Sequence, residues 1–371
     1  MITENDNRVQ YNKIIEQSDI ENIAWDISKL DYPSIKKTKL FDVLESFIFD
    51  NQVDVNANTD VNYLNIIVSL SGGVDSMVLI TFFIILKSYN PLINIIAIHI
   101  NYKNRDETDQ EEMFIKEWCN MNNIILKCHD MGMLRRATVS REYYESETKR
   151  LRFYYYTELL KTYNAKGIYL AHHKGDEQEN TFSNIINGKG LLSLSAMHDI
   201  SEINNVKIFR PFIDFPKSVL LEFAEKYNIP YFKDTTPIWS NRGKLRREIF
   251  PLLESVYGNK YLINFTNISN ESNEWKDFII SSIVKPFVLT HIQTEIANNF
   301  KKIIIKIDNE CKNNPSCFWD MIFKSQSLWI AKKTLNLIVY KITTGFIGKI
   351  PLRKNVLAEL TTTELIIRLH M

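Results

Sequence analysis

The residues best suited to chemistry lie in one short string, SLSGGVDS, at positions 69–76. An apolar run of β-branched residues precedes the string and an apolar segment of helical spacing follows it, so the string predicts a strand-to-helix turn. The start of a helix presents backbone N–H groups and the positive end of its dipole. Gly72 and Gly73 let the backbone approach a ligand closely, while Ser71 and Ser76 offer hydroxyl donors. The string therefore predicts a site for an anion such as phosphate.

This loop is neither a Walker A loop nor a G-x-G-x-x-G loop. A plain alternative is a strand-to-helix turn in which Asp75 and Ser76 only cap the helix. We favour the anion site because the whole string ends a strand and opens a helix. That position is the carboxyl edge of a parallel sheet, where α/β proteins bind ligands.

A second polar cluster, AHHKGDEQEN at positions 171–180, also follows a strand and precedes a helix, so it should lie on the same sheet edge. Asp176 and Glu179 share a helix face, so one could hold Mg²⁺ or an ammonium group while the other orients it. His173 is a candidate acid, base or hydrogen-bond donor, whereas we expect a structural role for His172. Taken alone, the cluster indicates two satisfied histidines before an acidic helix start. Beside the first loop, the site interpretation is favoured.

Two basic segments are candidates for contact with nucleic acid, because phosphate contacts dominate that binding. Residues 131–166 contain eight basic residues and four Glu, with aromatic residues between them that could stack on unpaired bases. For the aromatic residues 153–156 an ordinary place in the core is favoured. The second segment holds four cations within six residues: Arg242, Lys244, Arg246 and Arg247. A solvated basic turn and a nucleic-acid contact are both open for it.

The elements that would position these residues are strands alternating with helices. Strands are predicted at 66–68, 93–100, 124–126 and 167–171, and helices at 76–89, 108–122, 141–163, 177–187 and 218–227. This alternation predicts an α/β fold with a doubly wound parallel sheet, covered by helices on both faces. We place that domain at residues 63–258. An N-terminal extension (1–62), with predicted helices at 9–20 and 39–50, precedes it, and a smaller C-terminal domain (259–371) of unassigned fold follows it.

Composition fits a globular protein in a reducing compartment. With 371 residues, 45% hydrophobic and 24% charged, the chain suits two or three domains and is neither disordered nor fibrous as a whole. Its four cysteines form no C-x-x-C pair, which argues against a disulfide framework, a structural zinc site or a redox pair. Apolar runs end well short of about 20 residues, so we expect no membrane segment and a cytoplasmic location.

The formal charge of +1 is the sum of two unlike parts. Residues 1–63 hold 12 acidic and 6 basic residues, a net −6, which leaves +7 for the rest of the chain. The downstream chain is therefore the basic part, as a partner with phosphate groups would require.

The S-G-G-x-D-S loop resembles the signature of the PP-loop family of ATP pyrophosphatases, which adenylate an acceptor with ATP and release pyrophosphate. Within that family the sequence resembles tRNA(Ile)-lysidine synthetases, whose second segment reads about A-H-H-x-D-D-Q-x-E-T. Five residues match that segment: Ala171, His172, His173, Asp176 and Glu179. Three depart from it: Gly175 replaces the first Asp, Glu177 the Gln and Asn180 the Thr.

Weaker matches extend the resemblance to roughly residues 64–258. His99 and Arg105 fit the ends of an H-V-D-H-G-L-R segment, in which Asn101 and Tyr102 replace the central Asp and His. Lys149, Arg152 and Phe153 resemble an A-R-x-x-R-Y helix. Further matches to R-P-L and D-x-S-N…R-N-x-x-R…P segments, with altered spacing, are residues 210–212, Asp234, Ser240, Asn241, Arg246, Arg247 and Pro251.

The resemblance implies an adenine nucleotide alpha hydrolase-like fold and a set of roles. ATP would be bound by Ser71, Gly72, Gly73, Val74, Asp75, Ser76 and His99. Mg²⁺ would be held by Asp75 and Asp176, and Lys149 or Arg152 would stabilise charge developing on the phosphates. Asp176 and Glu179 would face the metal or the incoming amine, with His173 as acid, base or donor. The four cations at 242–247 and the C-terminal domain would contact tRNA.

In that family a tRNA cytidine is adenylated at its C2 carbonyl and lysine then displaces AMP. The implied partners are tRNA, ATP and lysine or another small amine, with no membrane and with a second copy of the chain as a candidate. One alternative keeps adenylation but transfers sulfur to a tRNA base, although the lack of C-x-x-C pairs disfavours it. Another is a nucleotide- or RNA-binding protein without catalysis, suggested by Asn101 and Gly175.

Overall fold

The computed structural model of the chain describes residues 30–52, 64–103, 108–132, 139–195, 197–232, 236, 240–297, 300–353 and 356–370. It divides into two compact units, Met1–Ser269 and Asn270–Met371, which are taken in turn. The predicted helix at 9–20 lies outside the described residues, and the domain boundaries drawn from the sequence stay predictions. No helix within the described ranges is both long and apolar enough to cross a bilayer.

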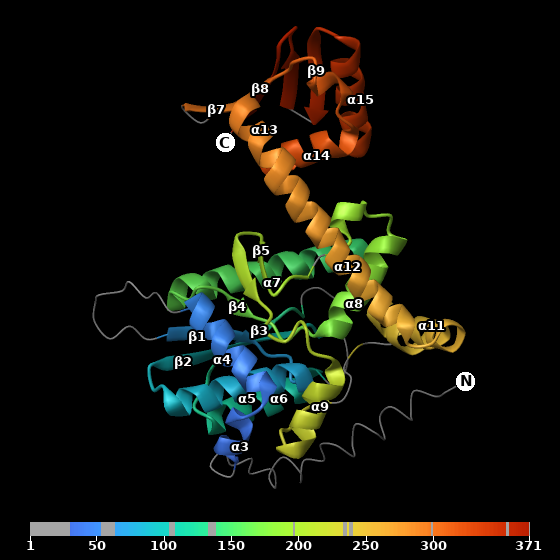
Figure 1. Cartoon of the computed structure of the whole chain (residues 1–371). Coiled ribbons are helices and arrows are strands. Elements are labelled where there is room, and N and C mark those ends of the chain that lie inside the picture. Colours follow the sequence, from blue (N-terminus) through green and yellow to red (C-terminus); the bar gives the residue numbers. More distant parts are fainter. Residues whose placement is uncertain are drawn as a thin grey trace. The chain divides into compact units, whose positions relative to one another are not determined.

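The first unit is built on a six-stranded sheet in the order β3-β2-β1-β4-β6-β5 (Figure 1). Its strands are β1 (Leu64–Ser69), β2 (Ile93–Asn101), β3 (Ile125–Asp130), β4 (Ile168–Tyr169), β5 (Ile200–Ile203) and β6 (Val206–Phe209). All neighbours pair in parallel except β5, which is antiparallel to β6 at the edge. The chain winds outward in one direction from β1 through β2 and β3, and in the other through β4 and β6. The crevice at the β1/β4 switch is where such sheets bind ligands.

Helices cover both faces of this sheet, which confirms the predicted doubly wound α/β fold (Figure 1). Ile67 and Ile96 point to the face covered by α7 (Arg141–Tyr163) and pack with Phe153 and Tyr156 of that helix. The alternate strand positions belong to the core on the opposite face, which is covered by α5 (Val74–Tyr89), α6 (Thr108–Met121) and α9 (Lys217–Lys226). Burial on both faces explains why these strands are continuously apolar.

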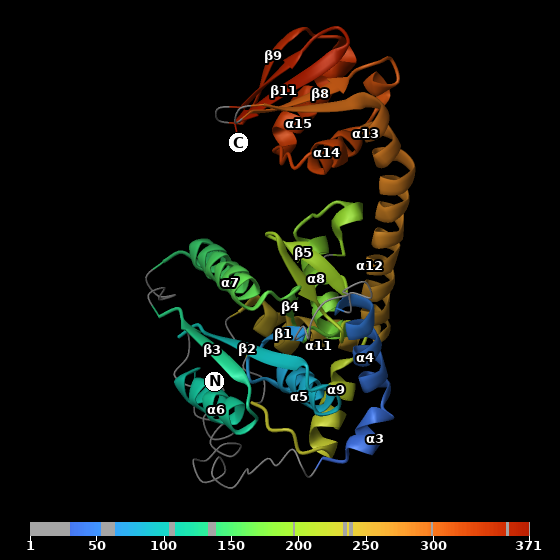
Figure 2. The same cartoon turned by 90° about the vertical axis from the view of Figure 1, so that its left-hand side faces the viewer.

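The described part of the N-terminal extension packs on α5 (Figure 2). It forms α3 (Tyr32–Lys36) and α4 (Lys39–Gln52), the latter close to the predicted helix at 39–50. The ring centroids of Phe41 and Phe82 lie 6.0 Å apart, and those of Tyr32 and Tyr89 lie 6.2 Å apart. These helices therefore extend the core of the first unit.

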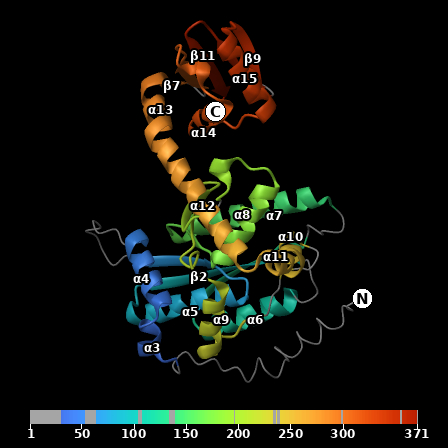
Figure 3. The same ribbon diagram turned by 45° about the vertical axis from the view of Figure 1, so that its right-hand side comes forward.

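Four helices complete the region around the site: α8 (Lys174–Ile186), α10 (Asn241–Lys244), α11 (Phe250–Tyr257) and the start of α12 (Lys260–Ile279), with a π-helical turn at Leu245–Ile249. Figure 3 shows α8 beside the start of α12, and polar side chains join the two helices. Gln178 Nε2 donates to Leu262 O and to Thr266 Oγ1, each at 3.1 Å. Ser269 Oγ donates to Glu177 Oε1 at 2.7 Å. These contacts hold the helix that carries the second polar cluster.

The second unit, whose fold the sequence left unassigned, contains a five-stranded antiparallel sheet in the order β7-β8-β11-β10-β9. Its strands are β7 (Ile292–Ala297), β8 (Phe300–Lys306), β9 (Gly348–Arg353), β10 (Val356–Leu360) and β11 (Glu364–His370). Its helices are α13 (Lys285–His291), α14 (Ser316–Ser325) and α15 (Lys332–Thr344), with a π-helical turn at Ile280–Val284. Trp319, Ile322 and Ile338 from these helices are fully buried with Ile303 and Ile305 of the sheet, so this unit has its own core.

Candidate functional site

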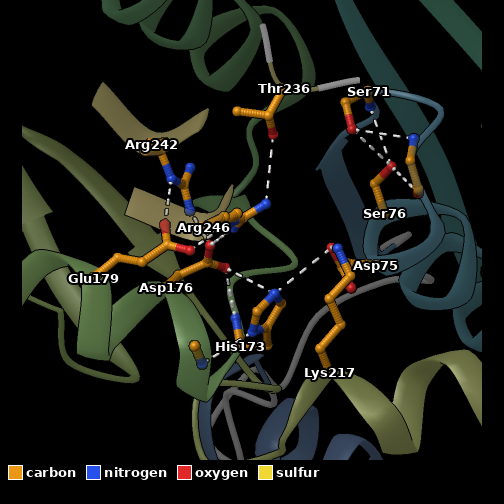
Figure 4. A network of polar contacts seen from close by, with 12 residues as sticks. Ser71, Asp75, Ser76, His173, Asp176, Glu179, Lys217, Thr236, Arg242 and Arg246 are labelled. Carbon is orange, nitrogen blue, oxygen red and sulfur yellow. Dashed lines mark hydrogen bonds and ion pairs between the residues drawn. The ribbon is translucent and has the colours of Figure 1, made fainter. Parts of the chain in front are cut away.

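The loop between β1 and α5 is shaped by glycine and serine. Gly72 has a φ of +84°, and a Cβ there would lie 2.7 Å from the ring of Phe232. Ser76 Oγ donates to Gly73 O at 2.9 Å and accepts from Ser71 N at 3.2 Å (Figure 4). The helix begins at Val74, and no side chain in the described part of the chain caps it. Its first N–H groups therefore still need an acceptor, as an anion site requires.

Asp75 lies in the first turn of α5 and faces the second polar cluster. Its Oδ2 is 3.9 Å from His173 Nε2 and 3.8 Å from Lys217 Nζ. Its Oδ1 is buried and has no hydrogen-bond partner among the described residues. Burial raises the pKa of Asp75, although Lys217 and His173 oppose that shift. A buried carboxylate oxygen with no partner is the kind of ligand that Mg²⁺ binds.

His173 caps the N-terminus of α8, and this fixes its tautomer. Its Nδ1 accepts the Gly175 N–H at 3.0 Å, while its own backbone N–H donates to Asp176 Oδ2 at 3.0 Å. Burial lowers the pKa of His173, so the ring is neutral at pH 7 and carries its hydrogen on Nε2. Nε2 is buried and 3.6 Å from Asp176 Oδ2, with no hydrogen-bond partner within the described ranges. Of the three roles expected for His173, this geometry favours that of donor.

Asp176 and Glu179 are each only 5% exposed and are paired with two arginines (Figure 4). Arg242 Nε donates to Glu179 Oε2 at 2.7 Å, and Arg246 Nη2 donates to Asp176 Oδ1 at 3.1 Å. The crossed contacts, Arg242 with Asp176 and Arg246 with Glu179, are also formed. Burial acts to raise the pKa of Asp176, but Arg242 and the histidines outweigh it and hold the pKa below its usual value. The structure thus joins two residues expected to contact tRNA to two expected to face the amine.

His172 lies beside the same cluster and accepts a hydrogen bond from an arginine. Arg210 Nε donates to His172 Nδ1 at 3.0 Å, and Arg210 Nη1 donates to His198 O and Ser201 Oγ at 2.8 and 2.7 Å. Burial lowers the pKa of His172 to about 4. The contact is of the structural kind expected for this histidine.

The remaining predicted residues differ in how far they are buried. His99 is buried, and its Nδ1 contacts Leu70 O at 2.9 Å, so it holds the backbone directly after β1. Arg152 has a buried Nε without a hydrogen-bond partner among the described residues. Lys149 is exposed on α7, and Lys244 and Arg247 are exposed near α10. Arg105 and Asp234 lie outside the described residues.

Some aromatic residues of α7 are buried in the core, and others are exposed where they could stack on a base. Phe153 and Tyr156 are buried as core residues, and Tyr156 donates to Ser69 Oγ at 2.9 Å. Tyr143 and Tyr154 are exposed, at 53% and 54%. Two of these rings could therefore meet a base, while the others support the sheet.

Two residues at the site were missed from the sequence, Lys217 and Phe232. Lys217 is the first residue of α9 and reaches Asp75. Phe232 N donates to Gly72 O at 2.9 Å and packs against the loop. No local pattern distinguished either residue, because each comes from a segment about 140–160 positions after the loop.

A helix N-terminus at the switch point of a parallel sheet, facing carboxylates and a lysine, defines a nucleotide-binding α/β domain. A family model described as a PP-loop domain matches residues 48–253, more than half of the chain. The chain therefore belongs to the PP-loop domain family.

Several curated relatives are named tRNA(Ile)-lysidine synthase. That of Chlamydia pneumoniae is 27% identical over 233 residues, covering 62% of this chain and 70% of the relative. That of Francisella tularensis subsp. novicida is 26% identical over 289 residues, covering 76% and 68%. That of Streptococcus mutans is 28% identical over 212 residues and is covered over only 47% of its length. Among solved structures, the U34-tRNA thiolase NcsA from Methanococcus maripaludis matches with a TM-score of 0.47 and 17% identity, covering 64% of this chain and 80% of that one.

Proposed function

We propose that this chain is an ATP-dependent ligase that modifies tRNA. It would transfer AMP from ATP to the C2 carbonyl oxygen of a tRNA cytidine, releasing pyrophosphate. Lysine, or another small amine, would then form a carbon–nitrogen bond at C2 and displace AMP. The observation that carries the proposal is the open N-terminus of α5 facing the Asp75, His173 and Asp176 group across the β1/β4 switch. The curated relatives named tRNA(Ile)-lysidine synthase support the choice of substrate.

ATP would lie with its phosphates against the loop. The N–H groups that open α5 would donate to phosphate oxygens, and the hydroxyl of the exposed residue Ser71, whose Oγ lies 3.1 Å from Ser76 Oγ, would turn to donate to them as well. Lys217, whose Nζ lies 3.8 Å from Asp75 Oδ2, would add a positive charge near the same phosphate oxygens. Asp75 Oδ1 would hold Mg²⁺, with Asp176 as the second carboxylate, and the bound ion would offset the negative charge of the leaving pyrophosphate.

The amine would approach from the side of Asp176 and Glu179. Since both carboxylates already share Arg242 and Arg246, an incoming ammonium group would compete with two guanidinium groups for them. The arginines keep the Asp176 carboxylate ionised, so it would attract the ammonium form of the amine, but its lowered pKa makes it a weak acceptor for the proton that the amine must lose before attack. His173 Nε2–H would donate to an oxygen of the adenylate between Asp75 and Asp176.

The tRNA would contact exposed cations around this edge. Lys149 on α7 and Lys244 and Arg247 near α10 are exposed, and Tyr143 and Tyr154 could stack on unpaired bases. The second unit would add further contacts. A cytoplasmic location follows from the proposed substrate.

The proposal is tested by incubating the protein with Mg²⁺, ATP, tRNA and isotopically labelled lysine. We expect pyrophosphate release, and label in a cytidine derivative when the tRNA nucleosides are analysed by mass spectrometry. Asp75→Asn should abolish both, whereas Asp214→Asn, at an exposed carboxylate outside the site, should not. Absence of pyrophosphate release would contradict the ligase, and pyrophosphate without label would show a different acceptor.

A further inference from the structure

The second unit contains a mixed group of metal-ligating side chains that has no role in the proposed function. His291 ends α13, Asp308 follows β8, and Cys311 begins the short 3-10 helix Cys311–Asn313. His291 Nε2 lies 3.0 Å from Asp308 Oδ2. The ligand atoms of all three residues lie within 4.8 Å of one another. We propose that His291, Asp308 and Cys311 form a binding site for a zinc-like divalent metal ion.

The imidazole of His291 is oriented with Nε2 toward the other two side chains. Thr290 Oγ1 donates to Pro286 O at 2.9 Å, so its one proton is used and the oxygen accepts from His291 Nδ1 at 2.6 Å. A neutral ring therefore carries its hydrogen on Nδ1 and a lone pair on Nε2. Phe287 stacks flat against the ring, with centroids 4.3 Å apart. A hydrogen bond from the non-ligating nitrogen is the usual support of a metal-bound histidine.

Asp308 and Cys311 are also fixed in place. Asp308 Oδ1 accepts the Cys311 backbone N–H at 3.0 Å, which leaves Oδ2 for His291. Cys311 is 1% exposed, and its Sγ lies 3.7 Å from Lys306 O. The lone pair of Nε2 and the carboxylate oxygen would repel each other unless a cation lies between them. A proton would join only these two atoms, whereas a metal ion would also use the sulfur.

The ligand types and their spacing suit zinc. Imidazole nitrogen, thiolate sulfur and carboxylate oxygen are all zinc ligands in proteins. Bonds of about 2.0–2.3 Å at tetrahedral angles place ligand atoms roughly 3.3–3.8 Å apart. From separations of at most 4.8 Å, side-chain movements of about 1 Å would close the site. The missing C-x-x-C pairs argued against zinc, but here the ligands come from two segments, the end of α13 and the loop that carries Asp308 and Cys311.

The test uses the full chain, stripped of metal with a chelator and titrated with Co²⁺. Tetrahedral Co²⁺ bound to a thiolate gives visible bands and a sulfur-to-metal charge-transfer band in the near ultraviolet. With Mg²⁺ present to fill the carboxylate site of the first unit, we expect the charge-transfer band to saturate at one Co²⁺ per chain and to be lost when Zn²⁺ displaces it. Cys311→Ser should remove the charge-transfer band, and Cys317→Ser, at an exposed cysteine of the same unit, should keep it.

A second variant separates binding from folding. Thr290 is exposed, so Thr290→Val should leave the circular dichroism spectrum unchanged while weakening Co²⁺ binding by about 10- to 100-fold. The proposal is overturned if the wild-type chain shows no charge-transfer band that saturates with Co²⁺. It is also overturned if the charge-transfer band persists in Cys311→Ser.

Discussion

Replacing Arg246 by Met tests whether the paired arginines hold the site together. Asp176 and Glu179 are almost fully buried, and Arg246 contacts both of them. Removing one partner of a buried ion pair costs about 3–5 kcal/mol, because a buried charge is left uncompensated. Arg242 still contacts both carboxylates, so we expect the lower end, a loss of about 3 kcal/mol in the free energy of unfolding of the first unit.

The assay is urea unfolding, combined with hydrogen exchange of residues 174–186 to confirm that the loss is local to α8. Lys244→Met is the matched control, because Lys244 is exposed two residues earlier, and its change should stay within about 0.5 kcal/mol. Equal stability of the two variants would refute the reasoning and return Arg246 to the tRNA contact expected from the sequence. Arg247→Met should instead weaken tRNA binding and lower its salt slope by about 1.

Three further outcomes follow from the same site. Gly72→Ala should destabilise the first unit by about 1–3 kcal/mol in urea unfolding, because φ is +84° and the new methyl group would meet the ring of Phe232. Gly73→Ala is the control: the atom nearest to its new methyl group would be 3.6 Å away, so this variant should unfold like the wild type. The pKa of His172 falls from about 6.5 to about 4 on folding, so between these pH values the unfolded chain binds more protons than the folded one. Acidification from pH 6.5 to 4 should therefore lower the free energy of unfolding by up to about 3 kcal/mol, and His172→Asn should lack this part of the pH dependence. Lys217→Met should weaken binding of a non-hydrolysable ATP analogue by about tenfold in calorimetry, because one charge-assisted contact is lost. Lys226→Met, at the other end of α9, should leave the affinity unchanged. Equal affinities of the two variants would remove Lys217 from the phosphate site.

The α/β core could be predicted from the sequence because its signals are local. Each predicted helix between 76 and 227 overlaps an observed one, since helical spacing and turn residues are properties of short windows. The β5–β6 hairpin was missed although a signal was present. Asn204 and Asn205 form its two-residue turn with φ of +52° and +60°, the conformation that favours asparagine there.

The second unit could not be predicted because its sheet depends on distant pairing. β8 pairs with β11, which places Phe300 opposite His370, and β7 pairs with β8. Each apolar stretch is therefore identified as a strand only once its distant partner is known. The pairing of the arginines with carboxylates could not be predicted for a similar reason. Four cations in six residues indicate a phosphate partner locally, yet the partners of Arg242 and Arg246 are carboxylates more than 60 positions earlier.

The two departures that suggested a protein without catalysis have local structural causes. Asn101 Nδ2 donates to Asp109 Oδ1 at 3.0 Å and to Glu112 Oε2 at 2.7 Å, so an aspartate there would bring three carboxylates together. A Cβ at Gly175 would lie 2.8 Å from His173 Cε1, so the glycine permits the ring orientation that directs Nε2 toward Asp75. Each change is matched to its neighbours. Local packing therefore accounts for both departures, and the pyrophosphate assay decides between a ligase and a protein without catalysis.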